Sequence, residues 1–107
     1  RRNVTETGRF DLGLTDQPHD DQFLQYSLDY WERPKRCALW RVDPDALVVD
    51  FILDLPSRGD TCFPSVVSVG TDAYHVYNYS SPLDGPDIGW LEGQGGVTNI
   101  YRTELFF

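Results

Sequence analysis

The chain has 107 residues, a length that accommodates one ordinary domain. Hydrophobic residues make up 40% of it, which is enough to build a core and excludes general disorder. Nine Lys and Arg against 17 Asp and Glu give a formal net charge of -8, which repels phosphate backbones. No apolar run approaches the ~20 residues of a membrane span. We therefore expect neither nucleic acid nor a membrane as a partner.

The two ends of the chain are unusual. It begins with Arg1-Arg2, contains no Met, and ends on the apolar run Leu105-Phe106-Phe107. We expect the chain to be a piece of a larger protein, with a processed mature domain as the alternative. No low-complexity repeat or linker divides it, so the 107 residues are expected to form a single unit.

Extended segments dominate the sequence. Segments rich in Val, Ile, Tyr, Phe and Trp favour pleated, half-buried backbone and predict strands. Turn signals lie at residues 42–46, where Asp43 and Pro44 suit the first two positions of a turn, and at residues 69–72, where Gly70 supplies a positive φ. We therefore expect an all-β fold of antiparallel hairpins. In chain order, the predicted strands are residues 23–30, 38–42, 47–53, 62–69, 73–79 and 99–107.

The connections between these strands differ in length. In an up-and-down antiparallel meander, successive connections alternate between the two ends of the sheet. The long, polar connections at residues 30–36, 56–60 and 80–98 then share one end, and the two tight turns share the other. A rigid β scaffold that presents its long loops on one side is typical of a binding face.

Two motifs resemble a known family. The segments LPSRGDTCFP at residues 55–64 and VYNYSS at residues 76–81 resemble the last blades of sialidase-like β-propellers, the superfamily that includes exo-sialidases and related glycoside hydrolases. A propeller blade is a four-stranded antiparallel meander. The resemblance implies about two blades, with the end of one and most of the next in residues 1–60 and the C-terminal blade in residues 61–107. Further blades, or copies of this chain, would complete the ring.

Asp60 and Tyr79 are the candidate catalytic residues. Asp60 stands at the mouth of a strand that the resemblance places innermost, where a carboxylate binds sugar hydroxyls or serves as an acid or base; the alternative is an Asp that caps its own turn. Phe63 stands where the resemblance leads us to expect the tyrosine nucleophile of true sialidases. Tyr79 is a substitute for it, with simple packing in the strand as the alternative.

Five further residues are candidate substrate-binding groups. A guanidinium matches a sugar carboxylate bidentately, and a Trp ring stacks on a sugar. The alternatives are a solvated loop with local ion pairs for the arginines, and packing on the sheet for the long loop at residues 80–98. The Asp-box motif of sialidases is absent, although SPLDG at residues 81–85 approximates it. The candidates are Arg36, Arg58, Trp31, Trp90 and Glu92.

No metal or cofactor is expected. The run His19-Asp20-Asp21 has three adjacent side chains that converge poorly on one ion, and no partner ligand has a supporting spacing. Cys37 and Cys62 each begin a predicted strand. In the absence of a secretion signal, free buried thiols are expected rather than a disulfide.

The sequence thus predicts part of a sialidase-like glycoside hydrolase propeller that contributes loops to a carbohydrate site and is inactive alone, because glycoside cleavage needs two suitably placed carboxylates. The alternative is a non-catalytic propeller module that binds a glycan or a protein. A purely structural segment is the third possibility.

Overall fold

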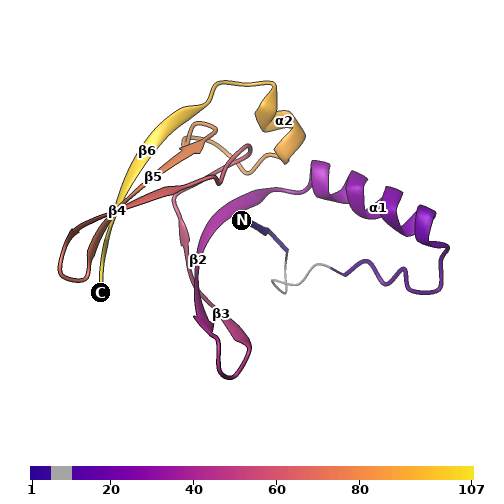
Figure 1. Cartoon of the computed structure of the whole chain (residues 1–107). Helices are drawn as coiled ribbons and strands as arrows, with labels where there is room; N and C mark the ends of the chain where they lie inside the picture. The colour runs from indigo at the N-terminus through magenta and orange to yellow at the C-terminus, as the bar shows by residue number, and fades with distance from the viewer. Residues whose placement is uncertain (6–10) are drawn as a thin grey trace.

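A computed structural model describes residues 1–5 and 11–107 (Figure 1). It contains two three-stranded sheets, β1-β2-β3 and β4-β5-β6, in which every neighbouring pair of strands is antiparallel. The prediction of an antiparallel, mostly β fold is confirmed. In chain order, the elements are β1 (Arg2–Asn3), α1 (His19–Glu32), β2 (Lys35–Asp43), β3 (Val48–Leu55), β4 (Ser65–Gly70), β5 (Ala73–Ser80), α2 (Trp90–Gln94) and β6 (Asn99–Phe106).

Two tight hairpins form where the turn signals predict them. Between β2 and β3, the Asp43 carboxylate accepts hydrogen bonds from the backbone N–H groups of Asp45 and Ala46, which closes the turn. Between β4 and β5, the expectation that Gly70 supplies the positive φ is wrong: Asp72 adopts it, at 53°, a conformation that Asp tolerates better than most residues. The hairpins therefore follow from local sequence.

The predicted strand at residues 23–30 is wrong, because these residues lie in α1. Pro18 precedes the helix, and Asp20 and Asp21 in its first turn favour the positive end of the helix dipole. Leu24, Leu28 and Trp31 recur at helical spacing, a pattern that the aromatic composition obscures. Among the described residues, neither helix is long and apolar enough to cross a membrane.

The strand predicted to begin at Cys62 begins instead at Ser65, as β4. Cys62 has a φ of 89°, a backbone conformation that a side-chain-bearing residue adopts only under constraint. This residue breaks the extended chain and redirects it into β4.

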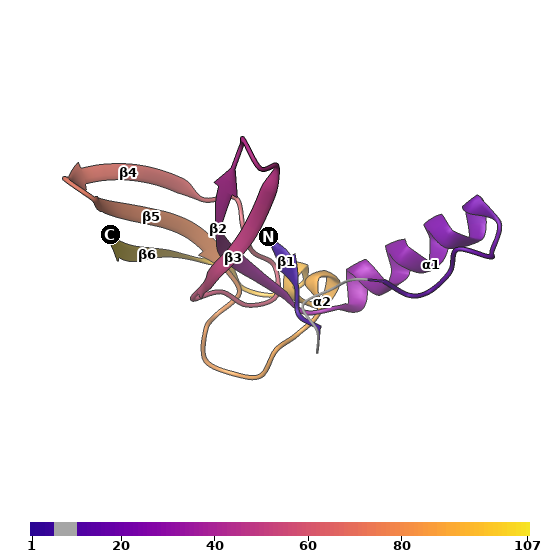
Figure 2. The same ribbon diagram turned by 90° about the horizontal axis from the view of Figure 1, so that it is seen from below.

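The two sheets meet near one end and diverge from there (Figures 1 and 2). Where they meet, Cys37 and Leu55 from one sheet and Val76 from the other form the buried cluster, which Cys62 and Leu105 flank. An open apolar cleft of about 390 Å³ lies directly against this cluster, and Cys37, Leu55 and Val76 line it. The only other buried hydrophobic residue within the described part of the chain is Leu14. The core is therefore small and lies beside the junction of the sheets.

Candidate functional site

The three long connections meet at the junction of the sheets, which we call the rim: residues 30–36, 56–60 and 80–98. Thr61 forms an isolated β-bridge with Ser80, and Pro34 forms one with Gly89. Arg36, in the first of these connections, forms an ion pair at 2.5 Å with Asp87 in the third. The predicted convergence of these segments is therefore confirmed, although a helix rather than a strand leads into the first of them.

Buried serines hold the rim together. Ser57 Oγ accepts a hydrogen bond from the Cys37 N–H (2.8 Å) and donates one to the Leu55 carbonyl (2.7 Å), which joins the ends of β2 and β3. Ser80 Oγ accepts from the Arg58 N–H, and Ser81 Oγ accepts from the Asp60 N–H. Because these hydroxyls satisfy backbone groups that would otherwise be buried without partners, they fix the chain around Asp60.

Two glycines allow the long loop to approach closely. A Cβ at Gly93 in α2 would overlap the backbone nitrogen of Asp60, and a Cβ at Gly89 would overlap the carbonyl oxygen of Glu32. The loop therefore packs backbone against backbone on both neighbouring connections. This packing places α2 directly beside Asp60.

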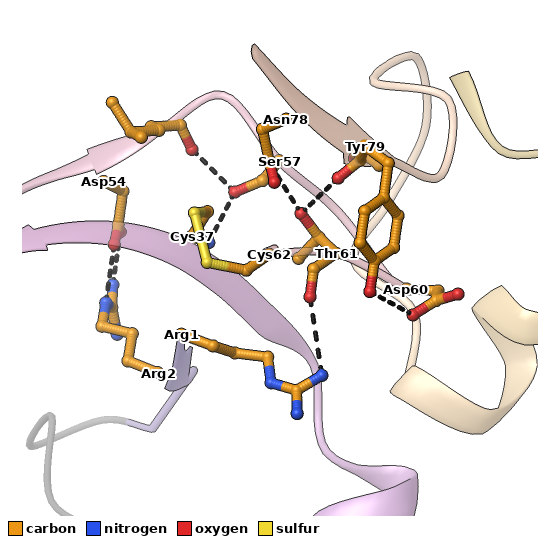
Figure 3. The surroundings of a disulfide bond; sticks show 12 residues. Arg1, Arg2, Cys37, Asp54, Ser57, Asp60, Thr61, Cys62, Asn78 and Tyr79 are labelled. Carbon is orange, nitrogen blue, oxygen red and sulfur yellow. Dashed lines mark hydrogen bonds and ion pairs between the residues drawn. A yellow bond between two sulfur atoms is a disulfide. The ribbon is translucent and has the colours of Figure 1, made fainter. Parts of the chain in front are cut away.

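A disulfide between Cys37 and Cys62 joins the two halves of the rim, with their Cα atoms 5.0 Å apart (Figure 3). The expectation of free thiols is wrong. Cys37 lies in β2 and Cys62 lies in the connection before β4, so the pairing depends on how the two sheets meet, which the spacing of the cysteines does not reveal.

Asp60, Tyr79 and Trp90 converge on one another. The Tyr79 hydroxyl donates to Asp60 Oδ1 (3.3 Å), and Trp90 Nε1 donates to the same oxygen (3.1 Å). The phenol comes from the end of β5, the indole from the start of α2, and the carboxylate from the connection between the sheets; Figure 3 shows the phenol pointing at the carboxylate. The two candidate catalytic residues thus form one cluster with a candidate substrate-binding residue.

The phenol of Tyr79 is held in its protonated form. Burial raises the pKa of Tyr79, and the charge and hydrogen bond of Asp60 raise this pKa further. A tyrosine nucleophile needs the opposite shift, because the phenolate is the reactive form. The environment of Tyr79 therefore suits a hydrogen-bond donor.

Aromatic rings that the sequence analysis did not select surround this cluster. The Tyr30 ring lies 5.9 Å from that of Trp90, and the exposed Phe63 ring stacks on Tyr79 at 6.1 Å. The Arg1 guanidinium lies over both Tyr30 and Phe63. Phe63 lies in the segment that carries the resemblance, so its aromatic character was the available signal. Nothing in the sequence distinguishes Tyr30 from other tyrosines.

Arg36 and Arg58 use their donors within the protein. Arg36 donates to the Ser57 carbonyl in addition to its ion pair. Arg58 donates to the carbonyls of Pro82 (2.8 Å) and Pro86, both in the long loop. In this arrangement the two arginines hold the long loop, which differs from the expected carboxylate clamp for a sugar.

Trp31 and Glu92 lie together on the other side of α2. They line a shallow groove of about 440 Å³ with Glu32, Gly89 and Leu91. Trp31 is 43% exposed, and Glu92 is exposed as well. The two residues are therefore accessible, but no hydrogen bond within the described part of the chain joins this groove to the Asp60 cluster.

Lys35, the only lysine in the sequence, is buried under the end of α1. Its Nζ donates to the carbonyls of Arg33 (2.9 Å) and Tyr30 and lies 4.0 Å from the centre of the Tyr30 ring. These bonds satisfy carbonyls that the helix leaves open at its C-terminus. Burial, with a smaller contribution from the Arg1 charge, lowers the pKa of Lys35 to about 8.

Comparison with known proteins finds no matching family model, no similar curated protein and no similar solved structure. The resemblance to sialidase-like propellers therefore stays a prediction. Among residues 1–5 and 11–107, no group of three or more His, Cys, Asp and Glu side chains could hold a metal ion. The Asp60 cluster is the strongest candidate site because a partly buried carboxylate lies among aromatic rings.

Proposed function

We propose that the rim is one sector of the carbohydrate site of a sialidase-like glycoside hydrolase propeller. The observation that supports this function is the Asp60 carboxylate, which Tyr79 and Trp90 orient through two hydrogen bonds to one oxygen. The second carboxylate oxygen has the lone pairs that accept a sugar hydroxyl. A fixed acceptor among aromatic faces matches the alternating hydroxyl groups and C–H surfaces of a sugar ring.

The surrounding rings supply the apolar part of the site. Phe63 is 75% exposed, and Tyr30 and Trp90 are each half-buried, so a ligand at Asp60 meets aromatic surface. The hydrogen bonds on Asp60 keep its rotamer fixed before a ligand binds, which reduces the entropy cost of binding.

The hydrogen bonds of the same cluster hold a single carboxylate, that of Asp60. Glycoside cleavage requires two carboxyl groups roughly 5–9.5 Å apart, one of which acts on the leaving oxygen. Within the described residues, the hydrogen bonds of the cluster involve Asp60 alone among carboxylates, Asp87 is paired with Arg36, and Tyr79 keeps its proton. We therefore propose that this chain by itself binds a glycan without cleaving it. The same observations support the second candidate, a non-catalytic glycan-binding module.

Glycan binding followed through tryptophan fluorescence tests this function. A panel of neutral and acidic oligosaccharides is titrated into the chain, and a binder is expected to change the emission of Trp90. Asp60→Asn keeps the shape of the side chain but removes its charge, and is expected to weaken binding at least tenfold. Asp84→Asn is the matched control, because Asp84 is an exposed carboxylate of the same long loop.

Equal binding by wild type and Asp60→Asn would place the site elsewhere. No binding across the panel would remove the proposed function and favour a purely structural segment. Turnover of a glycoside by the wild-type chain would contradict its proposed inactivity, and loss of that turnover in Asp60→Asn would assign Asp60 a catalytic role.

A further inference from the structure

Helix α1 projects away from both sheets, with only its C-terminal end close to α2 (Figures 1 and 2). None of its 14 residues is buried. The segment before the helix covers the side that carries Tyr26, whose hydroxyl accepts a hydrogen bond from the Leu12 N–H (3.1 Å) and donates one to Asp11 (3.1 Å). A helix of this length is marginal in water by itself and gains most of its stability from a packed apolar face. The side of the helix turned away from Tyr26 remains open in the described part of the chain.

An apolar stripe runs along this open side. Leu24, Leu28 and Trp31 recur at i, i+4 and i+7, a spacing that places them on one side of a helix. They are 56%, 45% and 43% exposed, and Phe23, which lines a shallow depression with Trp31, is 77% exposed. Ser27 lines the same depression, but its hydroxyl donates to the Phe23 carbonyl (2.7 Å) and is thereby satisfied within the helix. The stripe is therefore apolar surface in contact with solvent.

At its C-terminal end the stripe continues into the groove beside α2. Trp31 lines this groove together with Leu91, which is 55% exposed, and with Glu32 and Glu92. Within the described residues, neither Glu32 nor Glu92 forms an ion pair. The close backbone contact between Gly89 and Glu32 fixes α2 against the end of α1, so the groove exists before a ligand binds. An aromatic ring beside two such carboxylates suits the charged head of a Lys or Arg, whose alkyl stem packs on the ring.

The sequence around the stripe is acidic. Residues 11–32 contain six Asp and Glu and no Lys or Arg. Asp20 and Asp21 lie at the N-terminal end of the stripe, and Glu32 lies at its C-terminal end. Asp29 lies away from the stripe and pairs with Arg33 (2.7 Å), the first cation after this run. The open side of α1 is thus an apolar stripe with carboxylates at both ends.

We propose that this surface, the α1 face, docks a basic amphipathic helix of a partner protein. The apolar side of that helix packs on the stripe, and a Lys or Arg beside it reaches the carboxylates of the groove. Charge selects this occupant, because a formal charge of -8 attracts a cationic partner and repels a second copy of the chain, nucleic acid and an anionic lipid surface. Trp31 and Glu92 then contact a protein rather than a sugar, so the proposal stands apart from the glycan site at Asp60. The α1 face comprises Leu24, Leu28, Trp31, Glu32, Leu91 and Glu92.

Fluorescence anisotropy with a designed peptide tests the proposal. The probe is a fluorescein-labelled helix of 14 residues, the length of α1, with leucine on one side and lysine on the other. The wild-type chain is expected to bind it, and to bind it more weakly as salt rises because salt screens the attraction. One control peptide has glutamate in place of lysine, and another has the same residues in an order that forms no apolar side. Both are expected to bind at least about tenfold more weakly, and equal binding of either would overturn the proposal.

The first variant tests the stripe. Leu28→Ser removes apolar surface at the centre of the stripe and is expected to weaken binding about tenfold. Leu47→Ser is the matched control, because Leu47 is an 87% exposed leucine of the turn between β2 and β3. Circular dichroism checks that α1 persists in Leu28→Ser. Equal binding by the two variants would place the peptide elsewhere and overturn the proposal.

A second variant tests the groove and leaves the stripe intact. The double variant Glu32→Gln and Glu92→Gln removes two exposed carboxylates and is expected to weaken binding about fivefold and to reduce its dependence on salt. The double variant Asp45→Asn and Asp84→Asn removes the same net charge at exposed positions elsewhere and is expected to bind like the wild type. Equal weakening by the two double variants would show attraction to the net charge alone and would overturn the proposal.

Other occupants of the α1 face give distinct outcomes. A dimer of the wild-type chain in analytical ultracentrifugation that Leu28→Ser dissociates would assign the face to a second copy. Binding of phosphatidylcholine vesicles that Leu28→Ser abolishes would assign it to a lipid surface. Either result, or no binding of the leucine–lysine peptide at about 100 μM chain, would overturn the proposal.

Discussion

The rim and the far ends of the two sheets differ in what holds them. At the rim, a disulfide, buried serine hydroxyls and close backbone contacts leave few groups without partners. Toward the hairpin ends, Val42 and Val49 lie opposite each other and are 65% and 58% exposed. The rim is therefore stabilised by bonds within the chain, whereas the far ends leave apolar side chains exposed.

Removal of the disulfide is expected to lower the free energy of unfolding more than any other change at the rim. A cross-link between residues 25 apart stabilises a chain by about 3.5 kcal/mol through the entropy of the unfolded state. The double variant Cys37→Ser and Cys62→Ser is expected to lose about that free energy of unfolding, as urea denaturation measures. Val49→Ala, at the exposed far end, is expected to change it by less than about 0.5 kcal/mol. If the double cysteine variant and Val49→Ala lost similar free energies of unfolding, the rim would not be the more strongly stabilised region.

Substitution of Gly93 by alanine tests the close contact between α2 and the backbone of Asp60. Because the added Cβ would overlap the Asp60 nitrogen, α2 must shift, and Gly93→Ala is expected to cost about 1–3 kcal/mol of unfolding free energy and to change Trp90 fluorescence. Gly95→Ala at the C-cap of α2 is the matched control, because its Cβ would lie at an ordinary 3.6 Å from the Glu92 carbonyl oxygen. If both alanines are tolerated equally, α2 does not pack on Asp60 as described.

Removal of the Ser57 hydroxyl tests the contribution of the buried serine hydrogen bonds at the rim. Ser57→Ala leaves the buried Cys37 N–H without its acceptor and is expected to cost about 1–2 kcal/mol of unfolding free energy. Ser68→Ala on the exposed part of β4 removes a hydroxyl in contact with water, and little change is expected. Denaturation curves of the two variants measure the difference. A neutral Ser57→Ala would show that the rim does not depend on this bond.

The dependence of stability on pH tests the burial of the Lys35 ammonium group. The pKa of Lys35 is about 8 in the folded chain and 10.5 in a solvated lysine, so between these values the unfolded state binds more protons and stability rises with pH. The raised pKa of Tyr79 acts oppositely, lowering stability above pH 10. Between pH 8 and pH 10, the wild type is expected to gain stability relative to Lys35→Met. A constant difference across this range would contradict the burial of the ammonium group.

Local sequence predicted the strands and hairpins but not the helix. Residues of β2, β3, β5 and β6 carry β-branched and aromatic side chains, and Asp43 specifies its turn by itself. The prediction missed helix α1 because Tyr26, Tyr30 and Trp31 give the segment a strand-like composition. The helical spacing of its apolar residues and its acidic first turn were the better signals. The long connections do lie together, although the single meander from which this was predicted is replaced by a helix and two separate sheets.

The details of the candidate site depended on three-dimensional packing. The alternation of connections predicted that Asp60, Tyr79 and Trp90 share one rim. The two hydrogen bonds to Asp60 Oδ1 also require α2 to pack against Asp60, which Gly93 allows. The disulfide pairing and the internal use of Arg58 likewise depend on segments distant in sequence. Composition and spacing carry no information about such contacts.

Hydrogen exchange measured by mass spectrometry tests the contrast between the two regions most directly. Amides of residues 57–61 and 80–81 are expected to exchange slowly, because bonds within one chain protect them. Amides of residues 42–49, at the exposed end of the hairpin, are expected to exchange rapidly. Fast exchange at the rim, or protection of the hairpin end, would contradict the account.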